Sequence, residues 1–249
     1  MEDYSKLLKA IAAFIGAFAW PVTILAIVSF FRSELKATLG TLPLLLDRVR
    51  KATISGVALE LDRIADAETD KDKGNKITPG QIEAATRISV QAKGIGQDDL
   101  AHELDRLCLE YDSLRLALPS GVERTRAMTR VVVKMRSLAP SAKGFIDVYK
   151  GSGSPGSRLA AIAMMQMVPS VADLDWLAAR FEVEQQPFLL YHASLALQNA
   201  ANVSNTIEQK AHLRQVAEKA LAQVKDFRGA PDQGTIEVLE MLLSSLPKQ

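Results

Sequence analysis

The feature that constrains this chain most is a long uncharged segment near its N-terminus. Between Ala10 and Phe31 no residue is charged, and the only residues outside the hydrophobic types are Gly16, Pro21, Thr23 and Ser29. At about 1.5 Å of rise per residue, the segment would be about 33 Å long as a helix, enough to cross a hydrocarbon core of about 30 Å. We therefore predict an N-terminal transmembrane helix within residues 1–38.

A cleaved signal peptide is the alternative interpretation of this segment. Lys6 and Lys9 precede it, and Ala17-Phe18-Ala19 resembles a cleavage site. The apolar run continues well beyond that site, however, and this favours a retained span.

The charged residues that flank the span predict its orientation. Before it, Glu2 and Asp3 offset the two lysines, whereas five basic residues follow it: Arg32, Lys36, Arg48, Arg50 and Lys51. An excess of basic residues marks the cytoplasmic side of a membrane. A single cysteine, Cys108, cannot form an internal disulfide, which agrees with a reducing compartment. We predict a single-pass protein whose C-terminal part is cytoplasmic.

Residues 39–77 are expected to form a juxtamembrane collar, a short strand and a linker. Thr53–Leu61 alternates apolar residues as a short β-strand would, at Val57, Leu59 and Leu61. Because an isolated strand is unstable alone, the alternatives are pairing with neighbouring subunits or a helix misread as a strand. Asp66–Lys76 has no large apolar side chain and mixes both charge signs, which indicates a solvated linker.

Residues 78–249 are predicted to form an all-α domain. Thr78-Pro79 offers an N-cap followed by proline at the first helical position. Short amphipathic helices with small residues on their faces follow from Ser157 onward, a pattern typical of a HEAT-like stack, although no clear sequence period repeats. The predicted helices are Pro79–Lys93, Gln97–Leu116, Gly121–Leu138, Arg158–Val168, Val171–Phe181, Pro187–Ala201, Ile207–Phe227 and Thr235–Leu246. The expected fold class is therefore mainly α.

The sequence shows no catalytic or metal-binding grouping. Its three histidines are far apart, and no paired cysteines are spaced to hold zinc. Gly151–Gly156 fits the pattern G-x-G-x-x-G after the apparently extended Phe145–Tyr149. A dinucleotide site would need further parallel strands, which are missing, so we favour a plain Gly/Ser/Pro loop. We expect no enzymatic activity, no metal and no cofactor.

Basic residues gather between Leu118 and Arg158. This segment contains eight basic and two acidic residues, which gives it a local charge of +6. Helical spacing places Arg126, Arg130 and Lys134 in one stripe, which can neutralise the phosphates of a nucleotide or short oligonucleotide. The alternative is that these side chains are solvated or pair with acidic residues of another subunit. The predicted ligand-binding residues are Arg124, Arg126, Arg130, Lys134, Arg136, Lys143 and Lys150.

Four N-terminal residues are candidates for a pore or plug. In a symmetric oligomer, Glu2 and Asp3 would form a ring of carboxylates that attracts cations or plugs a channel. Phe14 and Phe18 would constrict such a bundle, although contact with lipid is the commoner role of phenylalanine in a span.

Two sets of short motifs resemble known bacterial proteins. Phe30-Phe31-Arg32, the Leu/Arg-rich collar and Gly56–Leu61 resemble single-span membrane effectors of antiphage defence. Arg158–Ala163 and Gln186–Leu197 are similar to helical sensor domains of bacterial conflict systems. The acidic start before the span is similar to the effector of Hailong-type defence, a channel gated by a nucleotide oligomer that a partner nucleotidyltransferase makes. The resemblance implies a location in the bacterial inner membrane and a nucleotidyltransferase encoded nearby.

We therefore expect a homo-oligomeric channel-forming effector, gated through its cytoplasmic domain by an anionic nucleotide or oligonucleotide. One span per subunit cannot enclose an aqueous path, so several copies are required, and we expect four. Its partners would be the lipid bilayer, other copies of the chain and the nucleotide signal. The alternative is a membrane-anchored helical adaptor that binds a protein partner.

Overall fold

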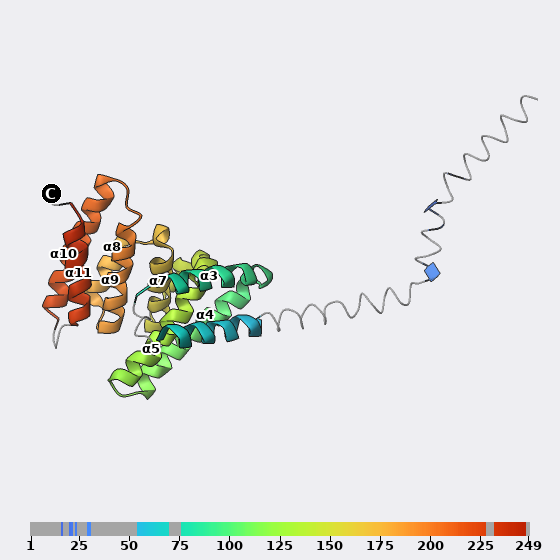
Figure 1. Cartoon of the computed structure of the whole chain (residues 1–249), viewed down its shortest axis with the longest axis horizontal. Coiled ribbons are helices and arrows are strands. Elements are labelled where there is room, and N and C mark those ends of the chain that lie inside the picture. Colours follow the sequence, from blue (N-terminus) through green and yellow to red (C-terminus); the bar gives the residue numbers. More distant parts are fainter. Residues whose placement is uncertain are drawn as a thin grey trace, which may run out of the picture. The chain divides into compact units, whose positions relative to one another are not determined.

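The computed structural model describes residues 54–69, 76–227 and 232–247, together with six positions nearer the N-terminus: Gly16, Trp20, Pro21, Thr23, Ser29 and Phe30 (Figure 1). The chain divides into two compact units, Met1–Ala52 and Thr53–Gln249. All six N-terminal positions are helical, but most of the predicted span and collar lies outside the described residues. So do Glu2, Asp3, Phe14 and Phe18. Among the helices that are described, none is both long and apolar enough to cross a membrane.

The described part of the second unit consists of helices and their connections. Residues 54–69 are helical and come first. The labelled helices then follow as α3 (Pro79–Gln91), η1 (Ala92–Gly94), α4 (Gln97–Ala117), α5 (Val122–Ala142), η2 (Lys143–Phe145), α6 (Ile146–Gly151), α7 (Pro155–Met167), η3 (Pro169–Val171), α8 (Leu174–Val183), α9 (Pro187–Ala201), α10 (Ile207–Lys225) and α11 (Gln233–Ser245). The described residues contain no strand, so the mainly α fold class is confirmed for this part of the chain.

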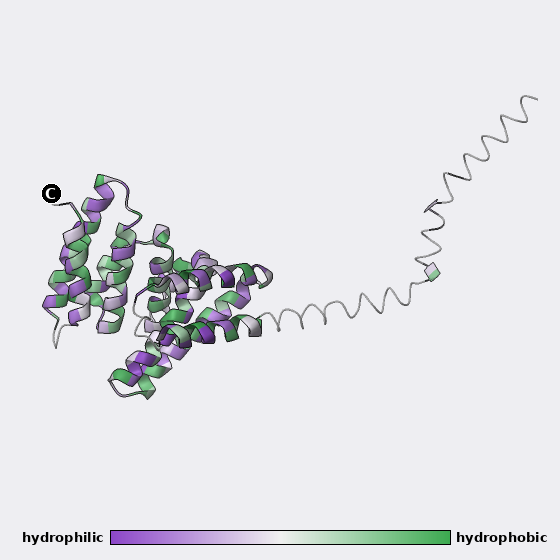
Figure 2. Ribbon diagram, in the orientation of Figure 1, coloured by the Kyte–Doolittle hydropathy of each residue, from purple (hydrophilic) through white to green (hydrophobic). Residues whose placement is uncertain are grey.

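The helices pack as a series of neighbours around one apolar core. α5 contacts α3, α4 and α7, and α7 in turn packs on α9. α9 contacts α11, which lies beside α10 (Figure 1). Each helix carries both hydrophobic and hydrophilic residues (Figure 2), and burying the apolar side of each against its neighbour stabilises the stack.

Local capping signals explain why several helix bounds were predictable. The Thr78 hydroxyl accepts a hydrogen bond from the Gln81 N–H at 3.1 Å, as an N-cap residue should. α9 spans Pro187–Ala201, which are the predicted bounds. Thr206 and Gln209 form a reciprocal capping box at the start of α10.

The predicted strand at Thr53–Leu61 is wrong, because residues 54–69 form a helix. Leu59 is 67% exposed, whereas Val57 and Leu61 are buried together with Ile64. These buried residues follow a helical spacing that a window ending at Leu61 is too short to reveal. The predicted linker also starts too early, since residues 66–69 continue this helix; residues 70–75 lie outside the described residues. The whole helix belongs to the Thr53–Gln249 unit.

The extended conformation expected at Phe145–Tyr149 is also wrong, because the chain there forms η2 and α6. Tyr149 is buried, and its hydroxyl donates a hydrogen bond to the Asp105 carboxylate at 2.8 Å. Ile146 and Val148 are two residues apart, which is the apolar spacing of a strand, and this led to the wrong prediction. In the structure Val148 is exposed on the short helix.

The glycine motif has a packing role at one of its three positions. A Cβ atom at Gly156 would lie 2.2 Å from the Cys108 carbonyl oxygen, so α7 can approach α4 this closely only with glycine there. Nothing lies within 4 Å of a Cβ atom placed at Gly151 or Gly153. Close helix packing therefore accounts for the third glycine without a ligand.

Candidate functional site: a cationic and aromatic pocket

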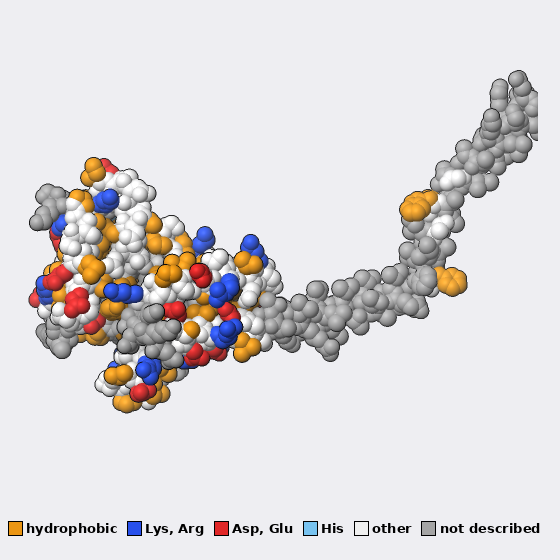
Figure 3. All heavy atoms as spheres, in the orientation of Figure 1, with side chains coloured by type: hydrophobic (Ala, Val, Ile, Leu, Met, Phe, Trp, Pro, Cys, Tyr) orange, Lys and Arg blue, Asp and Glu red, His pale blue; other side chains and the backbone are white. Residues whose placement is uncertain are grey.

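The structure places the predicted basic residues in different surroundings. On the face drawn in Figure 3, Lys and Arg side chains are interspersed with Asp and Glu rather than gathered in one patch. Arg126 and Lys143 are exposed, whereas Arg136 is completely buried. Lys150 is paired with Asp173 at 2.6 Å and with Asp147 at 3.1 Å.

Two members of the stripe hold the helix of residues 54–69 against α5. The Lys134 ammonium lies 2.7 Å from the Asp62 carboxylate and 3.5 Å from that of Glu110. Arg130 forms an ion pair with Asp66. Both basic residues thus pair with acidic residues of their own chain. The alternative of pairing with another subunit is not needed to neutralise them.

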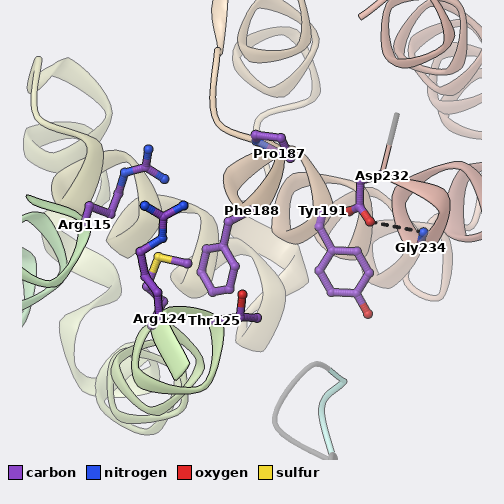
Figure 4. A pocket seen from close by; sticks show the side chains of 9 residues that line it. Arg115, Arg124, Thr125, Pro187, Phe188, Tyr191, Asp232 and Gly234 are labelled. Carbon is purple, nitrogen blue, oxygen red and sulfur yellow. Dashed lines mark hydrogen bonds between the residues drawn. The ribbon is translucent and has the colours of Figure 1, made fainter. Parts of the chain in front are cut away.

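Arg124, by contrast, lines a pocket of about 450 Å³. The pocket brings together residues from four helices and the segment that caps α11: Arg115, Arg124, Thr125, Met128, Pro187, Phe188, Tyr191, Asp232 and Gly234. Figure 4 shows the two guanidinium groups at one end, Phe188 in the middle, and Tyr191, Asp232 and Gly234 at the other end. Arg124 is the one predicted ligand-binding residue that lines it.

The turn between α4 and α5 places the two arginines together. Arg115 lies in the last turn of α4 and Arg124 near the start of α5. Gly121 connects the helices with a φ of +151°, a backbone conformation that side-chain-bearing residues rarely adopt. The Arg124 guanidinium also donates to the Leu118 carbonyl at 3.4 Å. Folding the hairpin therefore brings two positive charges to one pocket.

The aromatic wall comes from the first two turns of α9. Pro187 starts the helix, and Phe188 and Tyr191 project from it toward the pocket (Figure 4). The Phe188 ring stacks on Tyr111 at 6.0 Å between centroids and meets His192 edge-on at 4.5 Å. Because Tyr111 and His192 hold the Phe188 ring from two sides, this ring presents a preformed flat surface to the pocket.

The cap of α11 forms the opposite end. Asp232 accepts hydrogen bonds from the Gly234 N–H at 3.3 Å and the Thr235 hydroxyl at 2.6 Å. Its carboxylate is thus already engaged in capping the helix. A Cβ atom at Gly234 would come within 3.3 Å of the Tyr191 ring, so the absence of a side chain at this position leaves room for the ring.

A buried polar network lies directly behind the aromatic wall. Arg136 donates from Nε to the Gln166 side-chain oxygen at 2.6 Å, and its Nη2 lies 3.2 Å from His192 Nδ1. Burial, aided by the Arg136 charge, holds the pKa of His192 well below its usual value, so the imidazole is neutral. Burial likewise lowers the pKa of Arg136 to about 9. Arg136, predicted to bind ligand, instead joins α5, α7 and α9.

Burial also keeps the tyrosines of this region protonated. It raises the pKa of Tyr191, against the opposing effect of the Arg136 charge. It raises the pKa of Tyr111 as well, and there the neighbouring Arg115 guanidinium opposes it. Both phenol groups are therefore neutral near pH 7, and the fixed positive charge of the pocket comes from Arg115 and Arg124.

This arrangement suits the binding of a flat anionic ligand. Arginine forms bidentate hydrogen bonds with phosphate or carboxylate, and aromatic rings stack on flat ligands. Within the described ranges, no group of three or more His, Cys, Asp and Glu side chains is placed to hold a metal ion. The sequence analysis missed Arg115, because one arginine at a helix end carries no signal by itself. Phe188 and Tyr191 lie in the segment that resembles sensor domains, but only packing places them at the pocket.

Comparison with known proteins adds no precedent for this pocket. No protein-family model, curated protein or solved structure matches the chain.

Proposed function

We propose that the Thr53–Gln249 unit is a sensor domain that binds a nucleotide or short oligonucleotide in this pocket. The observation that carries the proposal is the convergence of Arg115 and Arg124 with Phe188 and Tyr191 on one space of about 450 Å³. That volume lies within the range of about 300–1,000 Å³ typical of small-molecule sites. The arginines would bind the phosphate, and the rings would stack on the base.

We further propose that the complete chain is a homo-oligomeric channel of bacterial antiphage defence, with four copies in the inner membrane. The uncharged run from Ala10 to Phe31, the motifs that resemble single-span antiphage effectors and the acidic start that is similar to the Hailong-type effector support this proposal. The nucleotide signal would come from a partner nucleotidyltransferase encoded nearby. A ligand can open or close such a channel only if it binds the two states with different affinity.

Binding measurements on the full-length protein in detergent test the pocket. The probes are ATP, inorganic pyrophosphate and 5′-phosphorylated di- and trinucleotides, titrated by calorimetry. Replacing Arg115 or Arg124 by glutamine removes a charge-assisted hydrogen bond and should weaken binding about ten-fold or more. Arg126→Gln is the matched control, because Arg126 is exposed on the same helix and does not line the pocket.

The outcomes separate the possibilities. Weaker binding in the two pocket variants but not in the control supports the assignment. Equal affinities for Arg124→Gln and Arg126→Gln, or no binding of any probe, contradict it. Pyrophosphate binding as tight as that of the nucleotides would assign the arginines to phosphate alone and remove the stacking role of Phe188.

Ion flux from liposomes tests the channel. Protein with residues 1–31 replaced by an unrelated span should lose flux if this segment lines the path. It should keep its function if the segment only anchors the chain.

A specific observation favours the adaptor as the second candidate function. A groove of about 590 Å³ between α3 and the ends of α5, α7 and α9 has apolar side chains at its surface. Ile82 and Val203 there are exposed, and Ile77 and Met167 also line the groove. Apolar surface of this kind marks binding sites for other proteins. Loss of partner capture in Ile82→Asp, with unchanged nucleotide binding, would support the adaptor.

A further inference from the structure

α5 connects the pocket to the helix formed by residues 54–69. Arg124, Thr125 and Met128 of α5 line the pocket. Arg130 and Lys134, about two and three turns beyond Arg124 on the same helix, form the ion pairs with Asp66 and Asp62. We call these two ion pairs the clamp. One helix thus carries both the wall of the pocket and the contacts that hold its neighbour.

The clamp fixes the first described helix that follows the N-terminal segment in the chain. On the inner side of that helix, Val57, Leu61 and Ile64 are buried. Asp62 and Asp66 contact α5 from more exposed positions. The Asp62 side chain is 54% exposed, but that of its partner Lys134 is only 7% exposed. The contact therefore joins a shielded cation of α5 to a carboxylate that water can reach.

No helix-breaking residue interrupts α5 between the pocket and the clamp. Between Arg124 and Lys134 it contains neither glycine nor proline, the residues at which helices bend most often. Its first turns are largely exposed, whereas nearly every residue from Met128 to Ala139 is buried. A force on the exposed end therefore reaches the clamp through a continuous stretch of helix.

We propose that an anion in the pocket loosens the clamp and so frees the helix of residues 54–69. This inference rests on the proposed function of the pocket and names its regulation. Without ligand, the like charges of Arg115 and Arg124 oppose close approach of the helix ends that carry them. A bound phosphate draws both guanidinium groups inward and shifts the start of α5. Because the Lys134–Asp62 contact is already at 2.7 Å, displacement of α5 weakens it.

Reciprocity makes the coupling measurable from both sides. If the ligand weakens the clamp, then a weakened clamp must strengthen ligand binding by the same factor. Because the Asp62 carboxylate is half exposed and Lys134 keeps Glu110 as a second partner, we expect a factor of about two- to five-fold. The coupling is therefore tested by the affinity of a clamp variant and by the mobility of the helix with ligand bound.

Hydrogen exchange of the full-length protein in detergent, with and without the tightest-binding 5′-phosphorylated probe, gives the first test. We expect slower exchange at the pocket, in the first turns of α5 and α9, and at least about two-fold faster exchange in residues 54–69. Slower exchange at the pocket reports the binding itself. The change in residues 54–69 reports the coupling.

Asp62→Asn gives the second test. The variant removes the main partner of Lys134, which keeps Glu110 at 3.5 Å. We expect its dissociation constant for the same probe to fall about two- to five-fold. Glu240→Gln is the control, because it removes a carboxylate of similar exposure from an ion pair of similar length, Lys225–Glu240 at 2.8 Å, which joins α10 to α11.

Each outcome decides the inference. Faster exchange in residues 54–69, together with tighter binding by Asp62→Asn but not by Glu240→Gln, supports it. Unchanged exchange in this helix with ligand bound overturns the coupling and leaves the pocket assignment intact, as does equal affinity of Asp62→Asn and Glu240→Gln. Absence of any binding by the parent protein overturns the pocket assignment, and the coupling with it.

Discussion

A methyl group added at Gly156 tests the close contact between α7 and α4. The Cβ atom of Gly156→Ala would lie 2.2 Å from the Cys108 carbonyl oxygen and 2.8 Å from the Cys108 Cα atom. These are backbone atoms in the middle of α4, so rotation of a side chain cannot relieve the overlap. α7 must move away from α4, which also disturbs the 2.8 Å hydrogen bond from the Gly156 N–H to the Asp112 carboxylate.

The size of the effect follows from these contacts. Overpacking a core costs about 1–3 kcal/mol in unfolding free energy, and backbone overlap places Gly156→Ala at or above the upper end. A loss of about 3 kcal/mol should lower the melting temperature of a domain of this size by about 6–12 °C.

Thermal unfolding followed by circular dichroism measures this loss. Gly151→Ala and Gly153→Ala are the controls, because a Cβ atom at either position meets nothing within 4 Å. If Gly156→Ala melts within about 1 °C of these controls, the packing argument is refuted. Both controls should also bind nucleotide like the parent, whereas a phosphate-binding glycine loop would make all three variants bind poorly.

Three further predictions concern the network, a helix cap and the pocket. The buried neutral His192 has a pKa below that of the unfolded chain, so lowering the pH from 6.5 to 5 should reduce the unfolding free energy measured by denaturant titration. His192→Gln should flatten this pH dependence; an unchanged slope would contradict the assignment. Thr206→Ala should lower the unfolding free energy by about 1 kcal/mol in the same assay, because it removes the capping box of α10; no loss would refute a role for the cap. Gly234→Ala should displace the Tyr191 ring and weaken nucleotide binding about two- to ten-fold in calorimetry without lowering the melting temperature; unchanged affinity would argue against stacking on this ring.

The prediction of a short strand shows where local patterns mislead. Val57, Leu59 and Leu61 alternate over five residues, but Ile64 extends the pattern to a helical spacing. A short window cannot separate the two periods when only three apolar residues fall within it. The correct assignment depended on which of these residues the neighbouring helices bury.

The basic stripe shows a second limit of sequence reasoning. Helical spacing aligns Arg130 and Lys134 on α5, but it does not reveal that Asp66 and Asp62 lie opposite them. Nor does it show that Arg136 is buried against Gln166 and His192. A charge in a sequence predicts a ligand only when no other part of the chain neutralises it.

The sequence by itself determined where most helices begin and end, because caps, prolines and apolar spacing act over a few residues. It also determined the uncharged N-terminal run, whose length alone predicts a span. Only the tertiary structure decided which cations remain available and that Arg115, Arg124, Phe188 and Tyr191 share a pocket. The two arginines flank the turn between α4 and α5, whereas the two aromatic residues lie on α9, far along the chain. Their proximity results from packing, which no local pattern encodes.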